Sequence, residues 1–485
     1  MGLVSNAKWV AFSQLFKIGV QVLNIVVLAR LIPPSEYGLM SMALVVTNFA
    51  LLVRDLGTAA AIIQRKDLQD ETINAIFWLN ILMGLAIAGI IIIFSPVISY
   101  LFHEPRLIFV LCLLAISFPL ASSASAHMAL LERESKFKKV ASIEIVSSVV
   151  AVAIAIIMAY RGFGVYSLVA QILILSLMSS TQLWLASKWR PSFKKIINLK
   201  EIKGLIGFSG NLTLFNFINY FSRNADSMMI GHYMSAAILG FYSLAYRIML
   251  FPLQSLTVVA SRALFPILSQ HQESNDKVRA TYLNVVYVIL LIVFPLMTGL
   301  AVLREPFIQL VFGAQWAMTA QILLWLAPVG IIQAVLSTTG SVFMAKGRTD
   351  ILMRLGILGA ILQVGAFVIG VRFDIDTFVK LYFIANVINF FPVMAILMWL
   401  VGGNLKDVFF KVYRIAISTM IMGGGIVLLC NWVGRYHRID NFVDLIVVAM
   451  LGTALYAVSM LLIDSTFRKA FMAISAKVSK RVGIV

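Results

Sequence analysis

The sequence predicts an all-α integral membrane protein with about fourteen transmembrane helices. Three observations predict this fold class. Of the 485 residues, 61% are hydrophobic and only 12% are charged, whereas soluble domains are about half apolar and about a quarter charged. The apolar residues gather in runs of about 20 or more, the length that one helical crossing needs. Lys and Arg collect in alternate breaks between these runs, as they do in cytoplasmic loops.

This composition excludes a soluble enzyme, a disordered chain and a nucleic-acid-binding domain, although the net charge is +18. Fourteen apolar runs follow one another along the chain. They cover about residues 8–31, 38–63, 73–99, 107–131, 140–160, 163–187, 204–226, 237–262, 281–303, 318–344, 350–371, 376–401, 411–433 and 442–463. Each can span a bilayer as a helix. The breaks between them reach at most about 20 residues, which is too short for a catalytic domain.

The basic residues predict the orientation of the chain. With the N-terminus inside, the inner segments carry 26 of the 39 Lys and Arg residues and the outer segments carry 8. Cytoplasmic segments are the ones enriched in Lys and Arg. We therefore expect a multi-pass membrane protein with both termini in the cytoplasm.

The longest inner break divides the first twelve helices six and six. We expect an N-lobe in residues 1–187, an interfacial linker helix in 188–204, a C-lobe in 205–401, two added helices in 402–463 and an amphipathic cytoplasmic tail in 464–485. The linker and the tail alternate apolar and basic residues, which is typical of helices that lie on the membrane surface.

The two halves also resemble each other weakly. Ala29-Arg30-Leu31 followed by Tyr37-Gly38 parallels Gly231-His232-Tyr233 followed by Leu239-Gly240. Six helices per half make this a parallel repeat, related by an axis along the membrane normal, which is typical of transporters. We expect the substrate to pass between the halves.

Charged residues inside the predicted spans are the candidate functional residues. A charge at the centre of a membrane helix costs at least about 2.5–3.5 kcal/mol, so it indicates function by default. We expect Lys17 and Arg247 near the midplane, Arg54 and Asp55 in the inner half, Arg30, Arg223 and Asp226 near the outer ends of their helices, and Arg262 near an inner end. Each of them can also have a purely structural role, by pairing or by reaching the headgroups.

As a set, the cations predict a cavity for an anionic, lipid-attached substrate. Lys17, Arg30, Arg54, Arg223, Arg247 and Arg262 are its candidate binding residues, since arginine suits phosphate. Asp55 and Asp226 are candidates for ion coupling or gating. The sequence has no Gly-rich phosphate loop and no metal-ligand spacing. We therefore predict no catalytic residues, no metal and no cofactor, with Na⁺ or H⁺ as possible coupling ions.

Several motifs follow one another in a characteristic order. They are Leu28-Ala29-Arg30-Leu31-Ile32-Pro33-Pro34-Ser35-Glu36-Tyr37-Gly38, Asp55-Leu56-Gly57, Ile62-Ile63-Gln64-Arg65-Lys66, Arg262-Ala263-Leu264-Phe265-Pro266, Val311-Phe312-Gly313 with Trp316, and Met344-Ala345-Lys346-Gly347-Arg348. In this order and spacing they resemble the polysaccharide transporter family of the multidrug/oligosaccharidyl-lipid/polysaccharide (MOP) exporter superfamily, most closely its colanic-acid exporter and O-antigen flippase branch. The resemblance covers residues 1 to about 400. The chain departs from it at Thr58, where relatives often have an apolar residue, and at His232, where many have Arg or Lys.

The resemblance implies alternating access by two six-helix lobes and places the candidate cations on helices that line the cavity. It implies a flippase for undecaprenyl-diphosphate-linked oligosaccharide repeat units, serving lipopolysaccharide or exopolysaccharide export. Partners would be the lipid-linked oligosaccharide, membrane lipids and other assembly proteins such as a polymerase or a chain-length regulator, and no nucleic acid. The alternatives are a peptidoglycan-precursor flippase, a cation-coupled drug exporter and, against the short outer loops, a membrane polysaccharide polymerase.

Overall fold

The computed structural model describes residues 3–54, 62, 69–193, 210–436, 441–469 and 471–472. All regular structure in these residues is helical, so the predicted all-α fold is confirmed. The first helices are α1 (Leu3–Leu31), α2 (Pro34–Arg54), α4 (Asp70–Leu101), α5 (Leu107–Ala115), α6 (Ser117–Arg133), α7 (Phe137–Tyr160), α8 (Val165–Ala186) and α10 (Gly210–Tyr233). They are followed by α11 (Ala236–Gln270), α12 (Asn275–Val302), α13 (Arg304–Val311), η1 (Ala314–Trp316), α14 (Ala317–Ala345), α15 (Thr349–Gly370), α16 (Ile375–Leu400), α17 (Leu405–Tyr436) and α18 (Phe442–Ile463).

The membrane crossings follow the apolar runs. Twelve segments of the described chain are long and apolar enough to cross a membrane. Helices α1 and α10 occupy the positions of the first and seventh predicted spans. Large apolar side chains stay exposed on the candidate spans, for example Ile93 of α4, which is 72% exposed. Helices that present apolar side chains outward and bond their backbone internally are suited to lipid.

The structure differs from the predicted spans in several places. The fourth predicted span is interrupted at Ile116, between α5 and α6. A short helix that the sequence did not suggest, α13, follows α12. Helix α10 continues to Tyr233, seven residues beyond the predicted end. The predicted linker helix lies largely outside the described residues, and so does the tail beyond residue 472.

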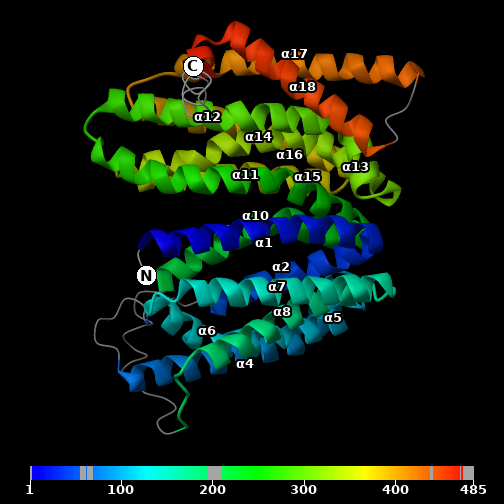
Figure 1. Ribbon diagram of the computed structural model, residues 1–485, viewed down its shortest axis with the longest axis vertical. Helices are drawn as coiled ribbons and strands as arrows, with labels where there is room; N and C mark the ends of the chain where they lie inside the picture. Colours follow the sequence, from blue (N-terminus) through cyan, green and yellow to red (C-terminus); the bar gives the residue numbers. More distant parts are fainter. Residues whose placement is uncertain are drawn as a thin grey trace, which may run out of the picture. The chain divides into compact units, whose positions relative to one another are not determined.

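The described chain divides into two compact units, Met1–Ser243 and Leu244–Val485, with the division inside α11. The predicted lobe boundaries stay a prediction. In the first unit, α7 packs against both α1 and α8, and α4 packs against α5 and α6 (Figure 1). Small residues make the close packing of α7 possible, because Ala151, Ala155 and Ala159 are buried at steps of four along one face.

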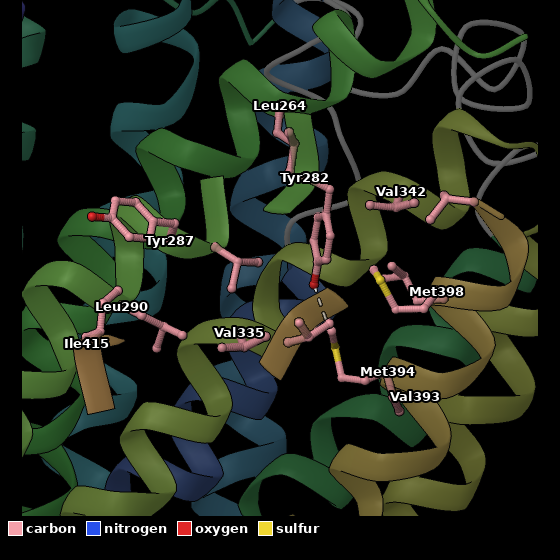
Figure 2. Close-up of a cluster of buried hydrophobic side chains, with 14 of the residues drawn as sticks. Leu264, Tyr282, Tyr287, Leu290, Val335, Val342, Val393, Met394, Met398 and Ile415 are labelled. Carbon is pink, nitrogen blue, oxygen red and sulfur yellow. Dashed lines mark hydrogen bonds between the residues drawn. The ribbon is translucent and has the colours of Figure 1, made fainter. Parts of the chain in front are cut away.

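The core of the second unit lies among α12, α14 and α16, with α17 against α12 (Figure 2). Tyr282 is fully buried there and its hydroxyl points at the sulfur of Met394, 3.7 Å away. A buried tyrosine hydroxyl needs such a partner, since an unpaired one costs about 1–3 kcal/mol. The Tyr282 hydroxyl is therefore satisfied within a hydrophobic cluster.

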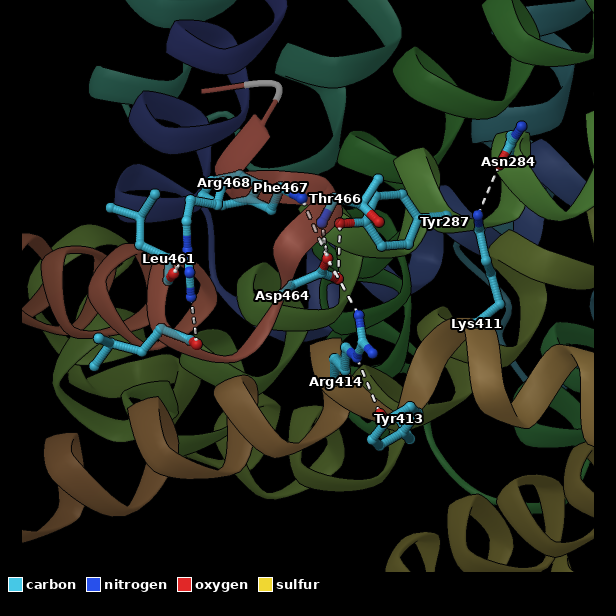
Figure 3. A network of polar contacts seen from close by, with 11 residues as sticks. Asn284, Tyr287, Lys411, Tyr413, Arg414, Leu461, Asp464, Thr466, Phe467 and Arg468 are labelled. Atoms are coloured by element: carbon cyan, nitrogen blue, oxygen red, sulfur yellow. Dashed lines mark hydrogen bonds and ion pairs between the residues drawn. The ribbon is translucent and has the colours of Figure 1, made fainter. Parts of the chain in front are cut away.

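One carboxylate contributes to joining the last two helices to this core. Asp464 follows the end of α18 and accepts hydrogen bonds from the Tyr287 hydroxyl of α12 at 3.0 Å and from the backbone N–H of Thr466 at 2.8 Å (Figure 3). Arg414 of α17 lies 3.8 Å from the same carboxylate. This arrangement joins α12, α17 and α18 at one point.

Candidate substrate-binding site

Helix α2 carries one end of the candidate site, and its start is fixed by local chemistry. Pro33 and Pro34 end α1 and begin α2, since proline is favoured at a first helical position. Glu36, in the first turn, accepts hydrogen bonds from the Arg106 guanidinium at 2.7 Å and from the Val165 backbone N–H at 2.8 Å. The hydrogen bond to Glu36 raises the pKa of Arg106. The start of α2 is thereby tied to the starts of α5 and α8.

Lys17 is paired in the structure. Its ammonium donates to a carboxylate oxygen of Glu144 in α7 at 2.7 Å, and both side chains are about one-third exposed. The sequence offered no acid near Lys17, because its partner is 127 residues away. Lys17 thus has a structural role in joining α1 to α7. Because Glu144 already neutralises its charge, Lys17 does not need a substrate anion as a partner.

Arg30 and Arg54 lie at the ends of their helices. Arg30 is the last residue but one of α1 and is exposed. Arg54 is the last residue of α2 and is half-buried. At about 1.5 Å per residue, α2 places Arg54 about 30 Å from its start at Pro34. Each of these cations therefore lies at the C-terminal end of its helix, and the length of α2 separates Arg54 from the start of α2.

Arg223 lies deeper than the sequence suggested. It is ten residues from the end of α10 at Tyr233, or about 15 Å along the helix. The predicted span ends at about residue 226, but the helix continues to Tyr233. Arg223 is exposed and makes no hydrogen bond or ion pair with the residues that the structure describes. Its guanidinium is therefore available to a ligand.

Arg247 has the same character in α11. It is eleven residues from the start of that helix at Ala236, again about 16 Å along the axis. It is exposed, and within the described residues it makes no hydrogen bond or ion pair. Arg223 and Arg247 thus lie at similar distances along their helices from the turn at residues 234–235.

Asp226 is buried and its hydrogen bonds come from neutral donors. It is 5% exposed, and accepts hydrogen bonds from the Tyr242 hydroxyl at 2.7 Å and from the Ser227 backbone N–H at 2.6 Å. No Lys or Arg of the described chain forms an ion pair with it. A buried acid without a cation is costly when ionised, so its charge state is open to change. Asp55 and the side chain of Arg262 lie outside the described residues.

Helices α2 and α10 pack together and form one wall that carries Arg54 and Arg223. The Tyr220 hydroxyl of α10 donates to the Val45 carbonyl of α2 at 2.5 Å. The Phe49 ring lies 5.5 Å from the Tyr220 ring, centroid to centroid. The structure thus brings Arg54 and Arg223 onto adjacent helices. A cavity shared by all six predicted cations stays a prediction, because Arg247 and Arg262 belong to the second unit.

The sequence missed side chains that hold this site together. Glu144 and Tyr242 were not among the predicted partners, and Glu36 was noted only as part of a motif. Glu144 and Glu36 could have been found by asking which carboxylates lie within or at the ends of spans, since such groups seek partners.

Comparisons with known proteins identify the family. The model of the polysaccharide biosynthesis protein family matches residues 27–321, more than half of the chain. The chain is 29% identical to the teichuronic acid biosynthesis protein TuaB of Bacillus subtilis over 87% of each chain. It is 27% identical to the lipopolysaccharide biosynthesis protein WzxC of Escherichia coli over 76% of this chain and 75% of that one. A probable low-salt glycan biosynthesis flippase of Haloferax volcanii, Agl15, is 22% identical over 97% of this chain and 98% of its own.

Two solved structures share the fold. The lipid II flippase MurJ in an inward closed conformation superimposes with a TM-score of 0.71 at 16% identity, over 95% of this chain and 99% of that one. An inward-facing multidrug transporter of the MATE family gives a TM-score of 0.56 at 14% identity, over 79% of this chain and 94% of that one. The chain therefore belongs to the polysaccharide biosynthesis protein family, and it is a multi-pass membrane protein that shares the fold of these two transporters.

Proposed function

We propose that this transporter is a flippase that moves undecaprenyl-diphosphate-linked oligosaccharide repeat units from the cytoplasmic to the periplasmic leaflet of a bacterial inner membrane. The observation that carries this proposal is Arg223, which is exposed about 15 Å along α10 from its end and has no partner in the described chain. A cation at that depth is costly unless it meets water or an anion. A diphosphate is the group that a planar guanidinium binds through two parallel hydrogen bonds.

The names of the relatives support a saccharide substrate. They are proteins of teichuronic acid, lipopolysaccharide and low-salt glycan biosynthesis, and the last is a probable flippase. These polymers differ in their sugars. A binding site common to such relatives would recognise the lipid diphosphate that carries the sugar, which is where the arginines contribute.

The distribution of cations supports a path through the first unit. With the N-terminus in the cytoplasm, as the Lys and Arg distribution favours, Arg30 lies near the periplasmic end of α1. Arg223 then lies at mid-depth and Arg54 near the cytoplasmic end of α2. Three cations at successive depths would lower the cost of moving a diphosphate across the hydrocarbon.

Asp226 is our candidate for ion coupling, with Asp55 as the second. The buried carboxylate of Asp226 has neutral hydrogen-bond donors and no ion-pair partner in the described chain. Uptake of a proton or a monovalent cation would relieve the cost of its charge. An imposed proton or sodium gradient should therefore stimulate the wild-type protein, and Asp226→Asn should flip at a rate that neither gradient changes.

The proposal is tested by flipping of defined lipid-linked oligosaccharides in proteoliposomes. Arg223→Ala and Arg247→Ala should each lower the initial rate about tenfold or more, the value expected for one lost charge-assisted hydrogen bond. Arg161→Ala and Arg372→Ala, exposed arginines between helices, are the matched controls and should keep the rate. Rates of Arg223→Ala and Arg247→Ala equal to those of the controls would contradict the proposal.

The same vesicles distinguish the other candidate functions. A peptidoglycan precursor lipid and a cationic drug, offered in place of the oligosaccharide lipid, test the precursor flippase and the drug exporter. Preferred transport of either one would replace our assignment. In cells, deletion of the gene should leave repeat units accumulated on the cytoplasmic leaflet, and unchanged surface polymer would count against it.

A further inference from the structure

The starts of α2 and α11 meet through a pair of glycines. A Cβ atom built on Gly38 would lie 1.5 Å from the Ala236 carbonyl oxygen, and one built on Gly240 would lie 1.9 Å from the Pro34 carbonyl oxygen. Real Cβ atoms do not approach backbone atoms within 3.0 Å. Only glycine therefore permits this approach at either position. All four residues belong to the first unit, and we call this meeting point the glycine contact.

The glycine contact is reciprocal. Gly38 and Gly240 are 202 residues apart, and so are Pro34 and Ala236. The same offset relates the two halves of the weak sequence repeat, in which Ala29 corresponds to Gly231. Gly38 touches Ala236, four residues before Gly240, and Gly240 touches Pro34, four residues before Gly38. Reciprocal contacts of this kind are the mark of a twofold axis, so the local axis of the repeat passes between these two helix starts.

Equivalent helices of a parallel repeat begin on the same side of the membrane. Helix α2 begins at Pro34 and α11 begins at Ala236, and the two starts meet. In the orientation proposed above, this is the periplasmic side. The two helix starts therefore meet on the side at which a substrate would leave.

A second contact lies at the same end. A Cβ on Gly231 would lie 2.7 Å from the Phe102 ring, and the His232 ring forms a hydrogen bond with the Leu101 carbonyl. These residues join the end of α10 to the turn after α4. The end of α10 and the start of α11, which flank one turn, thus both rest on helices of the first half.

Glu36 makes one side of the glycine contact rigid. It lies two residues before Gly38 and accepts hydrogen bonds from Arg106 and Val165. Gly164, at φ +55°, stands against its carboxylate, because a Cβ there would lie 2.7 Å from a carboxylate oxygen. The start of α2 is therefore fixed to its own half. At the glycine contact itself, the nearest atoms that a Cβ on either glycine would meet are backbone atoms.

We propose that the glycine contact closes the periplasmic end of the transport path and has to separate once in each cycle. This inference rests on the proposed transport function, but it concerns the closing surface and not the substrate. Gly38, Gly240 and Glu36 are then positioning residues for transport. A side chain at either glycine would hold the two helix starts apart and would favour the form that is open to the periplasm.

The first test is accessibility from the periplasmic side. Asn48 is exposed on α2, ten residues or about 15 Å beyond Gly38. Asn48→Cys, in a background with Cys112→Ala and Cys430→Ala, would be labelled in cells by a membrane-impermeant thiol reagent. Labelling should be slow in this parent and several-fold faster after Gly38→Ala or Gly240→Ala, and flipping should fall in both variants.

Gly89→Ala and Gly365→Ala are the matched controls, since a Cβ at either position meets no atom within 4 Å. They should label and flip like the parent. If Gly38→Ala and Gly240→Ala also behave like these controls, the inference is overturned.

The second test does not depend on the folding of the alanine variants. Ser41 and Ser243 each follow a glycine of the contact by three residues, so each lies on the same face of its helix as that glycine. A short bismaleimide should link Ser41→Cys to Ser243→Cys and stop flipping, while either single cysteine with reagent should remain active. Absence of the link, or full activity of the linked protein, would overturn the inference. Labelling and linking need no substrate, so a wrong assignment of the lipid-linked sugar would affect only the flipping assay.

Discussion

Two carboxylates, Glu36 in the first unit and Asp464 in the second, each tie several helices together, and they use different partners. Glu36 accepts from the Arg106 guanidinium at 2.7 Å and from one backbone N–H. Asp464 accepts from the Tyr287 hydroxyl and from the backbone N–H groups of Thr466 and Phe467, and its arginine, Arg414, stays 3.8 Å away (Figure 3).

The difference shows what each carboxylate can do. The Asp464 side chain is 3% exposed and that of Glu36 is 15% exposed. A buried carboxylate with several neutral donors fixes its surroundings, because each donor would be unsatisfied without it. A more accessible carboxylate that faces an arginine holds by charge, which water can replace. We infer that Asp464 fixes α12, α17 and α18 to one another, whereas Glu36 fixes the start of α2, which carries Gly38 of the glycine contact.

The largest effect should come from Asp464→Ala. This change leaves the Tyr287 hydroxyl and two backbone N–H groups without an acceptor, so we expect a loss of about 3 kcal/mol in the free energy of unfolding. The melting temperature in detergent, followed by tryptophan fluorescence, should fall by several degrees. Asp464→Asn keeps an acceptor oxygen and should lose less. Equal melting temperatures for Asp464→Ala and the wild type would mean that the other contacts of α18, among them the hydrogen bond from the Tyr456 hydroxyl to the Leu291 carbonyl, hold it without Asp464.

Much of this fold could be predicted because lipid imposes simple rules on a sequence. Helix α18 begins and ends where its apolar run does, at residues 442 and 463, since nothing but hydropathy defines it. The rules fail where helices contact protein. Helix α10 runs on through Gly231 and His232 because these residues pack against the turn after α4, and no local pattern reports such a neighbour.

The candidate site could be predicted only in its residue types. In the sequence, Lys17 and Arg247 looked alike as cations near the midplane, and Arg223 was expected near the outer end of its helix. The structure separates them, because Lys17 has Glu144 as its partner whereas Arg223 and Arg247 have none in the described chain. The separation rests on a contact between residues 127 positions apart. Spacing along one helix cannot contain that information.

Glu36→Ala should cost less stability than Asp464→Ala and more transport. We expect a loss of about 1–2 kcal/mol, since one backbone N–H and one exposed guanidinium lose their acceptor. The start of α2 would then be free to shift, and with it Gly38. Flipping in proteoliposomes should fall several-fold while the melting temperature changes little. Glu36→Gln, which keeps an acceptor for Val165, should recover part of the rate. A fall in melting temperature as large as that of Asp464→Ala would remove the contrast between the two carboxylates.

The arginine partners sharpen the same comparison. Arg106→Ala removes a 2.7 Å ion pair of a half-exposed side chain, so we expect a loss below about 1 kcal/mol. Arg414→Ala removes a guanidinium 3.8 Å from its carboxylate and should change the melting temperature less than Arg106→Ala does. Raising the salt concentration should weaken the Arg106 pair and leave the Asp464 site unchanged. The opposite order of the two variants would show that charge, not the neutral donors, holds Asp464.

The smallest effect concerns a third carboxylate, Asp374, which has neither burial nor an arginine. It caps α16 and accepts from the Thr377 backbone N–H at 2.8 Å, and the hydrogen bonds from Thr377 lower its pKa. A pKa that is lower in the folded state stabilises the fold above the unfolded value, about pH 4, and this contribution is lost as the pH falls through the folded value. The melting temperature should therefore decline slightly more steeply below about pH 4 in the wild type than in Asp374→Asn, which caps a helix equally well without titrating. Asp374→Ala should cost no more than about 1 kcal/mol at neutral pH. Identical pH profiles for the wild type and Asp374→Asn would show that the cap does not depend on the charge of Asp374, and that a carboxylate in this chain contributes to stability only where burial or an arginine supports it.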